Sequence, residues 1–287
     1  CTSLVGSEMC IRDRMCSIEI MKGELEVVYD GGLLPVPDAI IPRIGASRTF
    51  FGTAMVRHFE IMGAFSVAGN LAIARSRDKL RSLQVLSKQG VDMPRTVFAS
   101  NKANAKDVIK LSGGTPLVLK ILEGTQGVGV VLAETQKAAQ SVLDAFYGME
   151  VNLLVQEFIK EAGGSDIRAL VVNGEVVGAM KRQGAEGDFR SNLHQGGSAT
   201  AYKLNRKEKS MALAAAKAMG LGVCGVDMIP SDRGPLVMEV NSSPGLEGIE
   251  KATDVDIAGK IMNYIDVSIS PLPDNKKRRI KKDNIGA

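Results

Sequence analysis

Two segments near the C-terminal end, VCGVDMIP and PLVMEVN, read as the strands of one hairpin, yet each carries polar residues inside an apolar run. Because side chains alternate between the two faces of a strand, Glu239 and Asn241 share one face. A turn centred on Arg233 places Asp227 directly opposite Glu239. Facing carboxylates repel unless a cation separates them, and Mg²⁺ and Mn²⁺ prefer oxygen ligands. The hairpin therefore predicts a hard-metal site, with a solvated hairpin face as the alternative.

A glycine-rich link, EGTQG, joins two further predicted strands, TPLVLKIL and VGVVLAE. Gly124, Gly127 and Gly129 free the backbone to point N–H groups at an anion. Lys120 lies just before the link and can reach phosphates as a point charge. The link is not a Walker loop, because no Gly-Lys-Ser/Thr follows. Alone it is a weak signal, since a structural turn with a lysine on the wet face of a sheet would look the same.

Strand and helix signals alternate along the chain, which predicts an α/β or α+β fold. An Asn173-Gly174 turn predicts a second hairpin, IRALVVNGEVVGAMKR. Asn205 and Glu208 predict a capping box at the start of an alanine-rich helix that ends near Gly220. The predicted helices cover, in chain order, 50–63, about 76–89, about 136–147, 205–220 and about 254–268.

Length and composition limit the class of protein. A chain of 287 residues can bury a sizeable core and is expected to hold two lobes. Its four cysteines have no CxxC spacing, which favours a reducing, cytoplasmic setting. No apolar run is long enough to span a bilayer, so no membrane partner is expected.

The two ends of the chain differ in character from the rest. Residues 1–14 resemble translated adapter sequence and are not expected to belong to the fold. The formal net charge of +4 depends on the tail KKRRIKK, which supplies six positive charges, so the remainder sums to about −2. Direct nucleic-acid binding is therefore not expected, except as a weak contact of the basic tail, 269–287, which is predicted to be disordered.

The motifs together carry a resemblance. A strand lysine, a glycine hairpin, a QEF segment, an arginine-containing loop and an Asp…Glu-x-Asn hairpin occur in the order found in ATP-grasp enzymes. The pattern is similar to the RimK-type α-L-glutamate ligases. The stretches that carry it are IPRIG, ARSRDKLRS, PLVLKILEGTQGVGVVLAE, VQEFIKEAGGSDIR, EGDFRSNLHQGG, GVDM and LVMEVNSSPGLEGIEK.

The resemblance implies an ATP-grasp fold of two α+β lobes, preceded by an α/β pre-ATP-grasp domain that is expected to be truncated. The implied domains are residues 15–82 for the pre-ATP-grasp domain and 83–268 for the ATP-grasp domain. The latter divides into a smaller lobe, 83–158, and a larger metal-binding lobe, 159–268.

The resemblance also implies roles for particular residues, with ATP and two Mg²⁺ or Mn²⁺ ions as cofactors. The nucleotide residues are Lys79 and Lys120 for the α- and β-phosphates, Glu157 and Phe158 for the adenine edge, Asp166 for the ribose, and Gly124, Thr125, Gln126, Gly127, Gly129 and Ser191 around the phosphates. The metal ligands are Asp227, Glu239 and Asn241. Arg190 and Asn192 lie beside the transferring group, and Arg168 stabilises negative charge on the acyl phosphate or its tetrahedral successor.

The implied reaction is ATP-dependent ligation of a carboxylate to an amine through an acyl phosphate, with release of ADP and phosphate. The expected substrates are glutamate and the acidic C-terminus of a ribosomal small-subunit protein, and a homo-oligomer is expected. Arg43, Lys181 and Arg182 could attract an acidic peptide, with solvated surface charge as the second interpretation of the last two. The resemblance also leaves open a ligase for a coenzyme or carrier protein, a nucleotide-binding protein with little turnover, and a kinase on the same fold.

Overall fold

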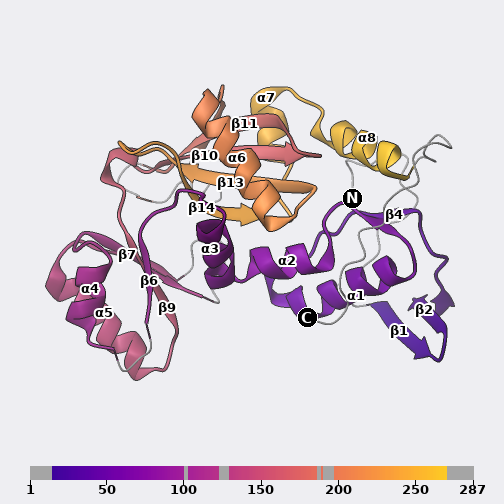
Figure 1. Cartoon of the computed structure of the whole chain (residues 1–287), viewed down its shortest axis with the longest axis horizontal. Coiled ribbons are helices and arrows are strands. Elements are labelled where there is room, and N and C mark those ends of the chain that lie inside the picture. Colours follow the sequence, from indigo (N-terminus) through magenta and orange to yellow (C-terminus); the bar gives the residue numbers. More distant parts are fainter. Residues whose placement is uncertain (1–14, 100–102, 123–128, 186–188, 190–196, 270–287) are drawn as a thin grey trace.

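The computed structural model describes residues 15–99, 103–122, 129–185, 189 and 197–269. Helices and strands alternate through these residues in a mixed α and β architecture, as the sequence predicts. Figure 1 shows a small lobe, a lobe built on a larger sheet, and an N-terminal part on the far side of helices α2 and α3.

The N-terminal part combines two small sheets with one helix. Its antiparallel sheet has the order β1-β2-β3, and β4 pairs in parallel with β5. The elements are β1 (Cys16–Met21), β2 (Glu24–Tyr29), β3 (Gly32–Leu33), β4 (Ala39–Ile40), α1 (Thr49–Ile61) and β5 (Phe65–Ser66). A small core formed by Cys16, Val27, Met55, Phe59 and Ala64 joins the first sheet to α1.

Two short helices, α2 (Asn70–Arg77) and α3 (Lys79–Lys88), replace the single helix predicted over 76–89. The break is at Asp78, whose extended backbone ends α2 and whose carboxylate caps α3 by accepting from the Arg81 amide at 2.9 Å. The predicted start was wrong because the leucine spacing of α3 does not reveal a capping aspartate. As a result, Lys79 is the first residue of α3.

The small lobe is a four-stranded sheet, in the order β6-β9-β7-β8, with two helices on it. The elements are β6 (Thr96–Phe98), α4 (Ala105–Leu111), β7 (Leu117–Ile121), β8 (Val130–Ala133), α5 (Gln136–Gly148) and β9 (Leu153–Glu157). The predicted β7–β8 hairpin and the Thr135 cap of α5 are confirmed. Strand β6 and helix α4 were not anticipated.

The large lobe is a five-stranded antiparallel sheet in the order β12-β11-β10-β13-β14. The elements are β10 (Ser165–Val172), β11 (Glu175–Gln183), β12 (Ser198–Ala201), α6 (Arg206–Met219), β13 (Val223–Ile229), β14 (Leu236–Asn241), α7 (Glu247–Thr253) and α8 (Ile257–Ile269). The Asn173-Gly174 turn and the Asn205/Glu208 capping box are both confirmed. Helix α7 and strand β12 were not anticipated.

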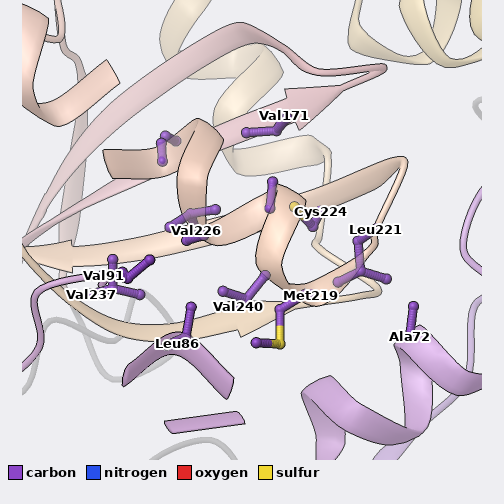
Figure 2. Packing of buried hydrophobic residues seen from close by; sticks show 14 of the residues in the cluster. Ala72, Leu86, Val91, Val171, Met219, Leu221, Cys224, Val226, Val237 and Val240 are labelled. Atoms are coloured by element: carbon purple, nitrogen blue, oxygen red, sulfur yellow. The ribbon is translucent and has the colours of Figure 1, made fainter. Parts of the chain in front are cut away.

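The faces of the large sheet pack against different helices. On one face, Val171, Val226, Val237 and their neighbours contact α6, α2 and α3, as Figure 2 shows for part of this core. On the other face, apolar residues such as Leu170 and Val172 pack against α7 and α8. By strand alternation, the second face continues toward Asp166 and Arg168, which share it with Leu170. The helices thus cover one end of this face and leave its polar end for a site.

Gly222 joins the large lobe to its neighbours and tolerates no side chain. A Cβ atom there would lie 2.5 Å from the Tyr264 hydroxyl oxygen and 2.8 Å from the Val67 carbonyl oxygen. The Val67 oxygen also accepts a hydrogen bond from the Val223 amide, so it cannot withdraw freely.

We therefore expect Gly222→Ala to lower the free energy of unfolding by about 1–3 kcal/mol, because overpacking forces backbone shifts. Gly148→Ala is the matched control: a Cβ atom there meets nothing within 4 Å, at the end of α5. Denaturant unfolding of both variants measures the difference. Equal stability of the two variants would contradict the close approach at Gly222.

Candidate active site

The polar end of the large sheet gathers charged residues from four strands on one face. The register pairs Arg168 with Asp227 and Asp227 with Glu239, so these three residues form one row across β10, β13 and β14. The next row pairs Asp166 with Arg182 across β10 and β11. The predicted pairing of Asp227 with Glu239 is therefore confirmed, although a bulge follows Asp227 on the turn side.

Asp227 is held by two arginines rather than left to repel Glu239. Arg168 donates from Nε to Oδ1 at 2.6 Å and from Nη2 to Oδ2 at 2.5 Å. Arg182 donates from Nη2 to Oδ2 at 2.9 Å. Burial alone would raise the pKa of the Asp227 carboxyl, but the charges and hydrogen bonds of the two arginines hold that pKa well below its usual range. Asp227 is thus ionised and fixed in direction.

Arg182 corrects one prediction from the sequence. It is 6% exposed and donates to both oxygens of Asp166, at 2.6 and 2.5 Å, as well as to Asp227. It is therefore a buried link between two carboxylates and not an exposed charge for an acidic peptide. Lys181, its neighbour, is exposed as expected.

Asp166, expected at the ribose, is 2% exposed and engaged by Arg182. Whether its carboxylate also reaches a nucleotide stays a prediction.

Glu239 belongs to the large lobe, whereas the lysines predicted to bind phosphate lie on α3 and on β7 of the small lobe. Glu239 is exposed on β14, the edge strand of the sheet. The surrounding protein and the negative charge of Asp227 raise the pKa of its carboxyl, while Arg168 and Lys120 act in the opposite direction. A divalent cation would relieve this unfavourable charge, so the two carboxylates are compatible with Mg²⁺ or Mn²⁺. Asn241 is partly exposed, and its Oδ1 accepts from the Ser243 amide at 3.0 Å.

The two lysines approach Glu239 from the other side. Lys79, at the start of α3, donates to the carbonyls of Ile121 and Leu122 at 2.9 and 3.1 Å. Lys120, on β7, donates to Gln156 Oε1 at 2.6 Å. Burial lowers the pKa of both lysines, and the charge of Glu239 opposes that shift in each. The structure thus brings Lys79 and Lys120 within electrostatic reach of Glu239.

The predicted adenine segment lies where the lobes are linked. The Glu157 amide donates to the Arg95 carbonyl at 2.9 Å, and its carboxylate accepts from the Arg95 amide at 2.7 Å and from Arg233. Arg233 belongs to the β13–β14 turn, so this contact ties the turn to the end of β9. Phe158 meets Phe189 edge to face, with ring centroids 6.3 Å apart. The residue after Glu157 is therefore one half of an aromatic pair.

Several predicted residues cannot be compared with the structure. Gly124, Thr125, Gln126, Gly127, Arg190, Ser191 and Asn192 lie outside the described residues. Gly129 is described: it has a φ of +77°, and a Cβ atom there would lie 2.8 Å from Ile121 Cδ1. A side chain at position 129 would therefore be strained and crowded.

Sequence reasoning missed two partners at the site. Gln156 relays Lys120 to the Thr96 hydroxyl, accepting at 2.6 Å and donating at 2.8 Å. It was visible only as the first letter of QEF, and its side-chain alternation could have placed it beside Lys120. The pairing of Arg182 was missed because a bulge on β11, where Val177 has no partner opposite Leu170 and Val171, changes the register of β11 with β10. Within the described residues, no helix is both long and apolar enough to cross a lipid bilayer.

Comparisons with known proteins agree with this arrangement. The RimK-like ATP-grasp domain model matches residues 76–265, and the RimK PreATP-grasp domain model matches residues 6–73. The second match begins inside the segment predicted to be foreign to the fold, residues 1–14, which lies outside the described residues.

Curated relatives are similar to this chain in sequence, and a solved structure is similar to it in fold. A protein of Teredinibacter turnerae named "Probable alpha-L-glutamate ligase" is 59% identical over 269 residues, or 93% of this chain and 89% of the relative. One of the same name from Saccharophagus degradans is 60% identical over 266 residues, or 93% and 88%. The structure of the ATP-grasp ligase PsnB, complexed with a minimal precursor, matches with a TM-score of 0.69 and 20% sequence identity. The match covers 89% of this chain and 86% of that one, and at this identity it supports the fold alone.

The fold is therefore an ATP-grasp fold with a pre-ATP-grasp domain. The RimK-like ATP-grasp model matches more than half of this chain, and the relatives are about 60% identical to it. The chain therefore belongs to the RimK family of ATP-grasp ligases.

Proposed function

We propose that this ligase adds glutamate, through an amide bond, to the C-terminus of a ribosomal small-subunit protein, at the expense of ATP. The observation that carries the ligase chemistry is the facing pair of Asp227 and Glu239, of which Glu239 lies within electrostatic reach of Lys79 and Lys120. Glutamate as substrate is supported by the relatives named alpha-L-glutamate ligase. The acidic protein C-terminus is the proposal that follows from the RimK resemblance.

Asp227, Glu239 and Asn241 would hold two Mg²⁺ or Mn²⁺ ions. When bound, ATP would supply a phosphoryl group and the ions would neutralise its charge. A substrate carboxylate would then be activated as an acyl phosphate, from which an amine displaces phosphate to form the amide bond. No nucleophilic side chain is required for either step. The chain's own work is therefore to orient reactants and to supply fixed positive charge.

The cations of the site have separate tasks in this proposal. Lys79 and Lys120 would neutralise the α- and β-phosphates, and Glu157 with Phe158 would offer main-chain groups to the adenine. Arg168 is committed to Asp227 at Nε and Nη2, so it would add positive charge beside the reacting carboxylate while fixing a metal ligand. Arg190 and Asn192 would lie beside the transferring group.

The competing functions share the ATP site and differ in the acceptor or in turnover. A ligase for a coenzyme or carrier protein would use the same metal hairpin. A nucleotide-binding protein with little turnover would have no need of Asp227, Glu239 and Asn241 together, so their joint presence favours the enzyme. The experiment that tests the proposal is incubation with Mg-ATP, glutamate and acidic-tailed acceptors, followed by phosphate release and acceptor mass. Phosphate release without any glutamate-sized mass increment would overturn the assignment.

Glu239→Gln keeps the shape of the side chain and removes its charge, so it should weaken the hold on the metal ions. We expect metal-dependent phosphate release to fall by about 100-fold or more, with the melting temperature preserved. Glu247→Gln is the control, since Glu247 is an exposed acid on α7 that pairs with Lys251. Metal-dependent activity that survives the Glu239 change would show that Glu239 does not hold the metal ions.

The lowered pKa of Asp227 gives a pH dependence with a definite sign. A carboxyl group whose pKa is lower in the folded state stabilises the protein above its unfolded pKa of about 4, and this contribution is lost as the pH falls further. Wild-type protein should therefore exceed Asp227→Asn in stability at pH 7, and the gap should narrow below about pH 4. Melting temperatures of both proteins across this range measure it. A gap that is constant or widens in acid would refute the ion-pair account.

Replacing Arg182 should be costly, because Asp166 and Asp227 would be left buried without their shared cation. We expect Arg182→Met to lower the free energy of unfolding by about 3–5 kcal/mol. Lys181→Met, the exposed neighbour on the same strand, should change it by less than about 0.5 kcal/mol. Denaturant titration compares the two, and similar losses in both variants would show that Arg182 does not link the carboxylates.

A further inference from the structure

A second polar cluster lies where the N-terminal part meets the turn after β14. Arg43 Nη1 donates to the Pro244 carbonyl at 2.6 Å, and Arg77 Nη2 donates to the carbonyl of Ile44, the residue after Arg43. A Cβ atom on Gly225 would lie 3.1 Å from Pro244 and 3.8 Å from Arg168 Cδ. The cluster therefore adjoins the row that holds Asp227 and Glu239.

Unsatisfied polar atoms concentrate at this junction. Among the described residues, the buried side-chain nitrogen and oxygen atoms that lack a hydrogen-bond partner are Arg77 Nε, Ser242 Oγ and Ser243 Oγ. Ser242 is only 4% exposed. Buried polar atoms are nearly always paired, so a group of unpaired ones requires a cause. All three belong to segments joined by the contacts of Arg43 and Arg77, and a bound ligand would satisfy them together.

The charge of the junction indicates the kind of ligand. Arg43 is exposed and donates to the Pro244 carbonyl, whereas Arg77 is partly buried and burial lowers the pKa of its guanidinium group. The charge of Glu239 partly offsets this for Arg77. Two guanidinium groups, of which that of Arg77 is partly buried, beside two serine hydroxyls, which can each donate a hydrogen bond, form an environment that attracts an anion. The planar fork of arginine matches a carboxylate.

We propose that Arg43, Arg77, Ser242 and Ser243 form a carboxylate-binding subsite that holds an acidic substrate beside the Asp227–Glu239 hairpin. The identification of the ligand as a substrate carboxylate rests on the proposed function. Two sources share this chemistry: a carboxylate of free glutamate and the acidic end of the acceptor chain. The subsite uses Arg43 of the N-terminal part and Arg77 of α2, whereas the nucleotide phosphates are assigned to Lys79 and Lys120, so the two anions are held by different residues.

The test is calorimetric titration of the full chain, saturated with Mg²⁺ and a non-hydrolysable ATP analogue, against defined probes. L-glutamate, L-glutamine and glutamate α-amide report which carboxylate of the free amino acid is bound. An acidic-tailed peptide, with a free or an amidated C-terminus, reports the acceptor. The variants are Arg77→Gln, Arg43→Gln and the double change Ser242→Ala with Ser243→Ala. Arg57→Gln is the control, since Arg57 is an exposed arginine on α1.

We expect Arg77→Gln to weaken one carboxylate probe by at least about tenfold while the affinity for the nucleotide analogue changes by less than about twofold. Loss confined to glutamate assigns the subsite to the amino acid, and loss confined to the peptide with a free C-terminus assigns it to the acceptor. Because Arg77→Gln also removes the bond to Ile44, the serine variant is the second test. Its hydroxyls have no partner to lose, so its melting temperature should not fall while carboxylate binding weakens.

Unchanged affinity for every carboxylate probe in all three variants overturns the subsite, as does wild-type protein that binds none of the probes. A loss of nucleotide affinity in place of carboxylate affinity also overturns it, because the junction would then hold phosphate. These outcomes are separate from failure of the proposed function. Arginine-dependent glutamate binding without any mass increment on an acceptor would leave the subsite standing and remove the ligase assignment for that acceptor.

Discussion

The site depends on one ionic network, in which Arg168 and Arg182 hold Asp227 and Arg182 also holds Asp166. Charges buried in a protein are tolerated only when they are paired and hydrogen-bonded, and each of these arginines meets that condition by binding a carboxylate with two nitrogens. The network spans β10, β11 and β13, so it fixes the register of the strands and the direction of Asp227 at once. Glu239, on the edge strand β14, remains accessible beside it.

Local signals in the sequence predicted much of this lobe. The Asn173-Gly174 turn, the Asn205 capping box and the pairing of Asp227 with Glu239 each depend on a few neighbouring residues. Arg182 could not be placed in the same way. A regular hairpin from the Asn173-Gly174 turn would set Lys181 opposite Asp166, but the bulge at Val177 of β11 shifts the pairing by one residue. A shift of one residue exchanges the faces of a strand, and Arg182 therefore becomes the buried partner.

Contacts between parts of the chain far apart in sequence were the least predictable. Lys79 contacts the end of β7 because Asp78 caps α3 and makes Lys79 its first residue, and Arg43 contacts the turn after β14 because the N-terminal part packs against the large lobe. Neither contact has a periodic or turn signature. The role of Lys79 was implied by the family resemblance, and the structure brings it, with Lys120 and Arg168, within electrostatic reach of Glu239.

In the proposed reaction, a substrate carboxylate is activated as an acyl phosphate beside the Asp227–Glu239 hairpin. The most direct test uses an acidic-tailed acceptor whose terminal carboxylate carries a heavy-oxygen label, incubated with Mg-ATP and glutamate. If phosphate is displaced from an acyl phosphate, one labelled oxygen leaves with it, and mass spectrometry of the released phosphate will detect the label. Acceptor that gains glutamate while the released phosphate stays unlabelled would contradict the acyl-phosphate route.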